Sequence, residues 1–378
     1  MAGAVSRDIS AAHLRLMPRW HAALALAAHY ARVVPCRALL PFGCSPLPPC
    51  CPLPCWRWGW FGALAWAGLA AITLFAAIMD RFGGLFRGSA PEGAEFPAAN
   101  SLLAALAGLH IALLPGMVAH LSGAAPLIDK IGLFLGASLW LGQISNPAAH
   151  ELIHRAPRAL FALGTVMFGM VLFGHHTSAH RLVHHTHAAT PLDPNTARSG
   201  EGFYAFFLRA WGGSFTRGLR AENDLRARKS GRKGFHPYAL HIGISAASLA
   251  LAFALGGLLG LAIWVLLSLS ATAQLMLSDY VQHYGLLRTK LPNGKYEPVQ
   301  NRHSWNAPHW YSSAMMVSAP RHSDHHAHPS RPYTALRLPN ATDAPRLPWP
   351  LPLACTIALF PPIWKRAIRP HLKPWLST

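Results

Sequence analysis

The sequence predicts an all-α integral membrane protein with five or six transmembrane helices. Of its 378 residues, 52% are hydrophobic and only 12% are charged, about half the charged share of an average soluble domain. Five apolar stretches of 19 to 22 residues account for this bias, at residues 58–79, 101–121, 131–149, 239–257 and 258–277. A helix needs about 20 apolar residues to cross a bilayer, where the backbone must satisfy its own hydrogen bonds. We therefore expect these stretches to be membrane-spanning helices.

The distribution of charge predicts which ends of these helices face the cytoplasm. The net charge is +19, with ten Lys and Arg residues at 175–238 and twelve more after His283. The short turns expected at 122–126 and 256–260 contain no Lys or Arg. Because basic segments stay on the cytoplasmic side of a membrane, both basic regions are expected there. Since membrane topology explains the positive charge, we expect no nucleic-acid partner.

Two further segments differ from these five helices. Residues 160–174 form an apolar run that is too short to span, so we expect a helix at the cytoplasmic boundary. Residues 20–34 are a weaker candidate for a sixth span because charged residues and histidines interrupt them. Residues 1–56 are expected to be a separate Pro/Cys-rich segment, with five of the six cysteines and no zinc-finger spacing. Residues 57–378 would then form the membrane domain.

Histidines are concentrated in two parts of the chain, with eight at 150–187 and seven at 283–328. Their spacing forms three clusters and a single: His150 and His154 in HELIH, His180, His184 and His185 in HRLVHH, His322, His325 and His326 in HSDHH, and His283 in QHYG. Residues three or four apart share a helix face, so each cluster can direct imidazoles at one point. Three clusters exceed what one four-coordinate zinc can use and instead suit two metal ions. All-nitrogen ligation is typical of iron, copper or zinc.

Two other functions that use clustered histidines are proteolysis by a zinc enzyme and metal transport. HELIH matches the HExxH pattern of zinc proteases, in which Glu151 would be the base, but that reading leaves the other clusters without a role. A metal transporter would hold its ligands near the middle of the bilayer. These clusters instead follow the ends of helices, which argues against transport.

The helix ends place the histidines at the membrane boundary. The stretch 131–149 ends at His150 and the stretch 258–277 ends shortly before His283. If all the histidines serve one site, both helices must finish on the same face. A lipid-soluble substrate can then reach a redox metal laterally from the membrane. The chain has no flavin, nicotinamide or nucleotide motif, so electrons are expected from a separate protein.

Five motifs, in order and with matching gaps over residues 57–375, resemble the membrane-bound alkane monooxygenases. They are HELIHR from His150, HRLVHH from His180 followed by TPLDP, YVQHYGL around His283, HSWN from His303, and RHSDHHAHP from Arg321. These enzymes belong to the histidine-rich di-iron hydroxylase and fatty acid desaturase-like superfamily.

The resemblance implies a six-helix di-iron hydroxylase domain at 57–378, in a bacterial cytoplasmic membrane with its site facing the cytoplasm. Two irons would be held by His150, His154, His180, His184, His185, His283, His322, His325 and His326. The implied reaction uses O2 and electrons from rubredoxin or a ferredoxin-type reductase to convert medium-chain n-alkanes to 1-alkanols. Possible supporting groups around the ligands are Glu151, Asp193, Gln282 and Asp324. His175 and His176, one turn before His180, are kept out of the metal set.

Several positions depart from the alkane pattern. Arg155 stands where those enzymes usually carry Lys, and Ala179 and Gln282 replace acidic neighbours of two ligands. Leu192 and the sequence PPIW at 361–364 resemble the xylene and cymene methyl-hydroxylases of the same superfamily. The alternative functions are hydroxylation of an alkyl-aromatic methyl group, and desaturation or hydroxylation of an acyl lipid.

Overall fold

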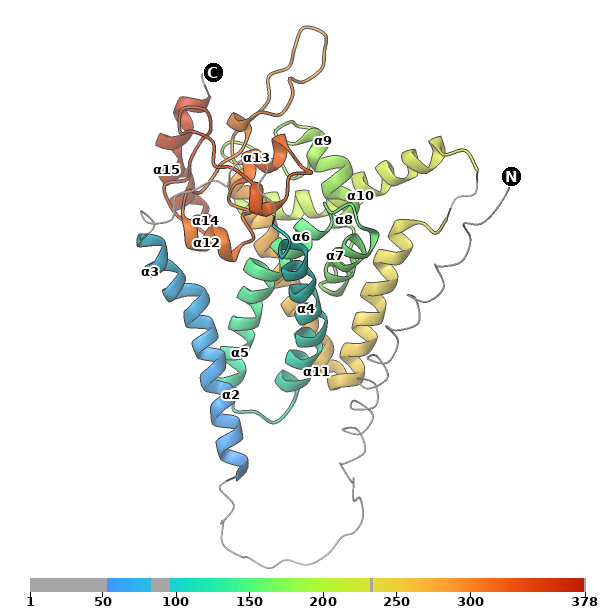
Figure 1. The fold of residues 1–378 in the computed structure, drawn as a ribbon, viewed down its shortest axis with the longest axis vertical. Helices are drawn as coiled ribbons and strands as arrows, with labels where there is room; N and C mark the ends of the chain where they lie inside the picture. The colour runs from blue at the N-terminus through green and yellow to red at the C-terminus, as the bar shows by residue number, and fades with distance from the viewer. Residues whose placement is uncertain (1–52, 83–95, 232–233, 377–378) are drawn as a thin grey trace, which may run out of the picture. The chain divides into compact units, whose positions relative to one another are not determined.

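A computed structural model describes residues 53–82, 96–231 and 234–376, and these residues form helices and loops (Figure 1). Within these ranges there is no strand, and two isolated bridges are the only β pairing. The residues from Leu53 onward form one compact unit. The candidate span at 20–34 and most of the cysteine-rich stretch lie outside the described residues.

Four helical stretches are long and apolar enough to cross a membrane: Gly62–Arg81, Ala98–Ser122, Leu127–Leu152 and Pro237–Gln282. Their helices are α2 (Leu53–Ala70), η1 (Ala71–Phe75), α3 (Ala76–Arg81), α4 (Ala99–Ser122), α5 (Leu127–Trp140), η3 (Leu141–Ser145), α6 (Asn146–Leu152) and α11 (Pro237–Gln282). Each predicted apolar stretch lies within a continuous helical run, although 58–79 and 131–149 each cross a π-helical segment. The outward faces of these helices remain exposed and apolar, as expected for an integral membrane protein.

Helix α11 contains a break that divides its 46 residues into two arms. A straight helix of this length would be about 69 Å long, more than twice the hydrocarbon core of a bilayer. Gly256 and Gly257 have non-helical backbone angles, and Gly257 has a φ of 58°, which favours glycine. A methyl group on Gly260 would lie 2.3 Å from the Ala252 carbonyl oxygen, so the arms approach closely. The chain therefore folds back here, as the two apolar stretches predict (Figure 1).

Helix α7 (Arg158–Met170) is a short apolar helix of 13 residues packed against α4, α6 and α11. At about 20 Å it is too short to cross the bilayer, as expected for residues 160–174. Its C-terminal end is fixed to α11, because the Trp264 indole N–H donates to the Met170 carbonyl (2.7 Å) and the Ser245 hydroxyl to the Gly169 carbonyl (2.9 Å).

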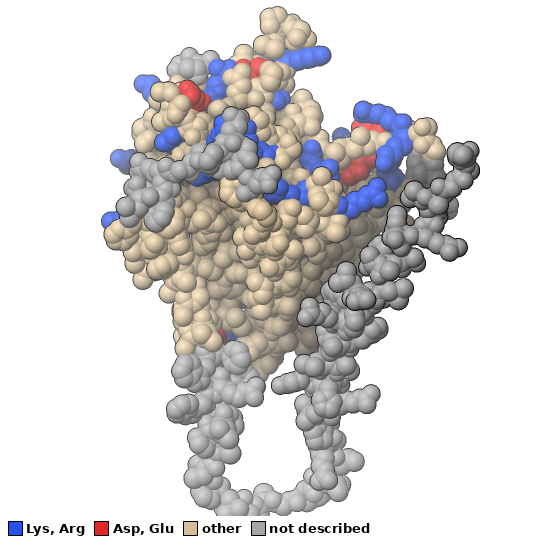
Figure 2. Space-filling view, in the orientation of Figure 1, with Lys and Arg blue, Asp and Glu red and all other residues tan. Residues whose placement is uncertain are grey.

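The remaining helices gather at one end of the membrane helices (Figure 1). They are α8 (His176–Ala179), η4 (His180–His184), α9 (His185–His187), α10 (Phe203–Arg228), η5 (Asn301–His303), α12 (Trp310–Met315), α13 (His322–Ala327), η6 (Tyr333–Ala335), α14 (Leu351–Ala358), α15 (Pro361–Leu372) and η7 (Lys373–Trp375). Figure 2 shows Lys and Arg concentrated at this end, above a surface with few charged residues. The basic residues thus gather at one end of the membrane helices, as their distribution along the sequence predicts.

The first membrane helix is tied to this polar end by three hydrogen bonds. The Asp80 carboxylate accepts from the backbone N–H groups of Tyr311 (2.9 Å) and Ser312 (3.1 Å), which begin α12. The Trp310 indole N–H donates to the Met79 carbonyl (3.0 Å). A buried carboxylate that accepts two N–H groups from the start of a helix caps that helix and favours its macrodipole. Asp80 therefore fixes α12, which leads into the histidines of α13.

Candidate metal centre

The structure brings all nine predicted ligand histidines together in two groups. The first group is His150, His154, His180, His185 and His325, and the second is His184, His283, His322 and His326. Within each group the candidate ligand atoms all lie within 4.8 Å of one another. They come from the end of α6, the segment η4–α9, the end of α11 and α13.

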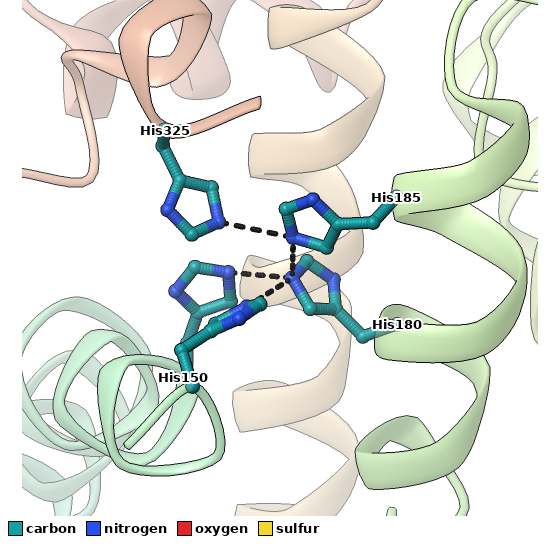
Figure 3. A group of neighbouring side chains, drawn as sticks. His150, His180, His185 and His325 are labelled. Carbon is teal, nitrogen blue, oxygen red and sulfur yellow. Dashed lines mark hydrogen bonds between the residues drawn. The ribbon is translucent and has the colours of Figure 1, made fainter. Parts of the chain in front are cut away.

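In the first group the imidazoles point their Nε2 atoms at a common centre (Figure 3). The Nε2 of His180 lies 2.7 Å from that of His150 and 2.9 Å from that of His185. The Nε2 atoms of His185 and His325 are 3.1 Å apart. Two nitrogens bound to one metal at about 2.1 Å and at right angles lie about 3.0 Å apart. These spacings fit shared coordination of one metal ion.

The second group repeats this geometry in a more enclosed place. The Nε2 of His322 lies 2.9 Å from that of His283 and 3.1 Å from that of His326. All four side chains are buried. Each group thus has its own set of closely spaced nitrogen donors, and two such sets fit two metal ions better than one.

The two sequence clusters HRLVHH and HSDHH are each divided between the groups. His180 and His185 join the first group while His184 joins the second, and His325 is separated in the same way from its helical neighbours. The π-helical segment η4 shifts the register of a normal helix, so that residues five apart can share a side. Each cluster therefore connects both candidate metal positions, which differs from the expectation that a cluster serves one point.

Burial and crowding favour the neutral form of most of these imidazoles, whereas Asp193 raises the pKa of His184. Burial, reinforced by neighbouring histidines, lowers the pKa of His154, His180 and His325 well below the ordinary value. The same causes lower the pKa of His322 and His326. Neutral imidazole is the form that binds a metal ion, so the chemistry of the donor set fits metal binding.

Asp193 is the predicted supporting residue that contacts a candidate ligand directly. Its Oδ2 accepts from the Nδ1–H of His184 (2.9 Å) and from the Thr196 hydroxyl (2.8 Å). Burial alone would raise the pKa of Asp193, but His184 and the backbone N–H of Asn195 hold it below its usual value. An acceptor on Nδ1 leaves Nε2 free and fixes the ring orientation, which is how carboxylates support metal-bound histidines.

The other three predicted supporting residues hold nearby loops instead. Glu151 accepts from Arg155 (2.5 Å) and from the backbone N–H of Tyr333 (2.9 Å). The Gln282 amide donates to the Ala319 carbonyl (3.0 Å). Asp324 accepts from the side chains of His328 and Arg331 and from the backbone of Arg337.

Two buried polar residues that the sequence reasoning did not single out extend the Asp193 network. The Asn195 side-chain amide donates to the Asp279 carboxylate (2.8 Å), and both residues are buried. Asp279 lies one turn before His283 in an otherwise apolar helix. An acidic residue in such a helix is a signal of a functional role, and it was available in the sequence.

A cavity of about 180 Å³ opens beside both histidine groups. His150 from the first group and His322 from the second line it. Most of the surface of its wall is apolar, and contributors include Leu139 of α5, Leu275 and Leu277 of α11, Met316 after the end of α12 and Leu359 after the end of α14. A hydrocarbon chain in this cavity would therefore lie next to both candidate metal positions.

Comparison with known protein families identifies the family of this chain. The sequence model that describes the fatty acid desaturase family matches residues 124–352, more than half of the chain. The chain belongs to the fatty acid desaturase family. The matched residues of this desaturase-family domain contain every candidate ligand.

Characterised members of the family are similar to this chain over much of its length. Alkane 1-monooxygenase 1 of Alcanivorax borkumensis is 36% identical over 251 residues, which cover 64% of this chain and 61% of that protein. Alkane 1-monooxygenase 1 of Pseudomonas aeruginosa is 32% identical, covering 66% of this chain and 65% of that protein. The xylene/toluene monooxygenase hydroxylase component of Pseudomonas putida is 29% identical, covering 62% and 63%. The chain thus spans somewhat less than two thirds of the length of these relatives.

Proposed function

We propose that this protein is a membrane monooxygenase that hydroxylates the terminal methyl group of medium-chain n-alkanes. The observation that carries the proposal is the cavity, which has apolar walls and is lined by one histidine from each group. The alkane 1-monooxygenases among the relatives support the same reaction. The reaction balances as one alkane, one O2, two electrons and two protons giving one 1-alkanol and one water.

The nine histidines are the residues proposed to hold two iron ions. Bound iron would supply the redox chemistry that O2 activation requires. The protein's own contribution is to orient the imidazoles, by packing them tightly and through the hydrogen bond from His184 to Asp193, and to exclude water from an apolar site. His150 and His322 would place the reacting methyl group beside both ions.

The protein is proposed to lie in a bacterial inner membrane, with lipid around its apolar helices and its polar end facing the cytoplasm. Lys and Arg are concentrated at this end (Figure 2). Basic residues favour the cytoplasmic side of a membrane. The same orientation would make the histidine groups accessible to a soluble electron donor.

The electron donor is proposed to be an acidic redox protein, rubredoxin or a ferredoxin-type reductase. A surface cleft is lined by His154 and His185 of the first group and by Arg155, Arg158 and Arg181. Its lining residues, all within the described ranges, include no Asp or Glu. Positive charge beside the partly buried ligands His154 and His185 favours docking of a negatively charged partner close to the metal site.

A paired substrate assay tests the proposal. Membranes that contain the protein, supplied with rubredoxin, its reductase and reduced nicotinamide, should convert octane to 1-octanol. Replacing His185 or His326 by Ala should abolish the product, whereas the change His371→Ala, at an exposed position, should not. Conversion of xylene without any conversion of octane would refute the alkane assignment and favour an aromatic methyl group, as the xylene/toluene relative suggests.

A further inference from the structure

His176 is a buried histidine that the proposed metal sites do not use. Its side chain is 1% exposed, and neither ring nitrogen has a hydrogen-bond partner. The ring packs against Phe173 and Phe168, with centroids 5.1 and 4.8 Å away. It belongs to neither group of converging ligand atoms.

His176 lines the cavity at the end nearest the metal groups. The cavity wall includes His176 together with His150 and His322. The His176 ring centroid lies 4.9 Å from that of His180, one helical turn further along the chain. The unpartnered nitrogens are thus close to the place where the substrate carbon would react.

A buried polar group without a partner costs about 1–3 kcal/mol, so such groups usually bind water or a ligand. We propose that His176 hydrogen-bonds the hydroxyl group of a 1-alkanol held in the cavity. A neutral imidazole has one donor and one acceptor nitrogen, and a hydroxyl group can pair with either. The apolar wall suits the alkyl chain, and Asp279, which also lines the cavity, disfavours a carboxylate ligand.

The inference rests on the proposed function in one respect, because terminal hydroxylation would place a hydroxyl group on the carbon nearest the metals. His176 is then a specificity-determining residue: it strengthens binding of the alcohol through a hydrogen bond and does not affect binding of the alkane. The consequence is that 1-alkanols compete with alkanes for the cavity.

An alkanol could also bind in the opposite orientation, with its hydroxyl group away from His176, and the experiment must distinguish the two orientations. Gln143, about two helical turns before His150, also lines the cavity and has an unpartnered carbonyl oxygen. A hydroxyl group bound there would direct the methyl end toward the metals. His176 is favoured because it is more deeply buried and both of its nitrogens lack partners.

Calorimetric titration of the iron-loaded protein in lipid nanodiscs, corrected with empty nanodiscs, would measure binding of 1-octanol and 1-chlorooctane. The two probes are similar in size, but only the alcohol donates a hydrogen bond. The affinity for 1-octanol divided by the affinity for 1-chlorooctane should be about threefold to tenfold higher in wild type than in His176→Phe, which keeps an aromatic ring. The variant His176→Gln, which retains a donor and an acceptor, should restore much of the preference.

The neighbouring change His175→Phe is the matched control, because His175 is buried but does not line the cavity. It should leave the affinity ratio unchanged. An unchanged ratio in His176→Phe, or a ratio lost in Gln143→Leu instead, would overturn the proposal. Octane turnover by wild type is measured separately, so failure of the proposed function is distinguishable from failure of this inference.

Discussion

Replacing Asp193 by Asn should weaken the second histidine group selectively. The carboxylate accepts from His184, Thr196 and the backbone N–H of Asn195, with no solvent to replace it. An amide of the same shape can accept on only one of its two positions and carries no charge. Losing a charge-assisted hydrogen bond costs about 1.5–3 kcal/mol, which corresponds to about a tenfold to hundredfold loss of metal affinity.

The assay is iron content, measured by mass spectrometry after dialysis against chelators of increasing strength. Wild type should retain about two irons per chain under conditions in which Asp193→Asn retains about one, because only His184 depends on this acceptor. Asp324→Asn is the matched control, since Asp324 is similarly buried but contacts loop residues. Equal iron retention by wild type and Asp193→Asn, or equal loss in Asp324→Asn, would refute the reasoning.

Three further predictions concern the rest of the site. Asp80→Ala removes the acceptor of the Tyr311 and Ser312 N–H groups and should destabilise the fold by about 1–2 kcal/mol, seen as a lower melting temperature; no change would contradict the role of Asp80 as a cap. Iron removal leaves buried imidazoles whose pKa values lie below those of the unfolded chain, so the unfolded chain binds more protons in acid. The melting temperature of the chelated protein should then fall as the pH is lowered from about 7.5 to about 5.5, and a rise would show the opposite linkage. A methyl group on Gly142 would lie 2.2 Å from the Gln274 amide, so Gly142→Ala should push that amide into the cavity and shift the product yields toward 1-alkanols made from shorter alkanes. An unchanged chain-length profile would count against this wall of the cavity.

The sequence was sufficient for the helices and for the set of converging histidines. Apolar length and the spacing of HELIH, HRLVHH and HSDHH are local properties that a helix preserves. The break at Gly256 and Gly257 also followed from sequence, because a single apolar run of that length exceeds one bilayer crossing. The uneven distribution of Lys and Arg along the sequence also indicated which end of the helices is polar.

The partition of the histidines and their hydrogen-bond partners required the structure. The π-helical register of η4 separates His184 from His180, and an ordinary helical repeat does not predict this. Proximity in sequence identified Asp193 as a supporting residue but also indicated Asp324, which faces a loop. His176 was noted only as a neighbour of His180, because its unpartnered nitrogens and place in the cavity depend on long-range packing.

The central claim is that this protein inserts one atom of O2 into a terminal C–H bond of an alkane. The most direct measurement is octane turnover by the iron-loaded protein, with its electron donor, under ¹⁸O2. We predict 1-octanol that carries one ¹⁸O atom, formed only when iron and O2 are both present. An alkene product, or 1-octanol whose oxygen comes from water, would contradict it.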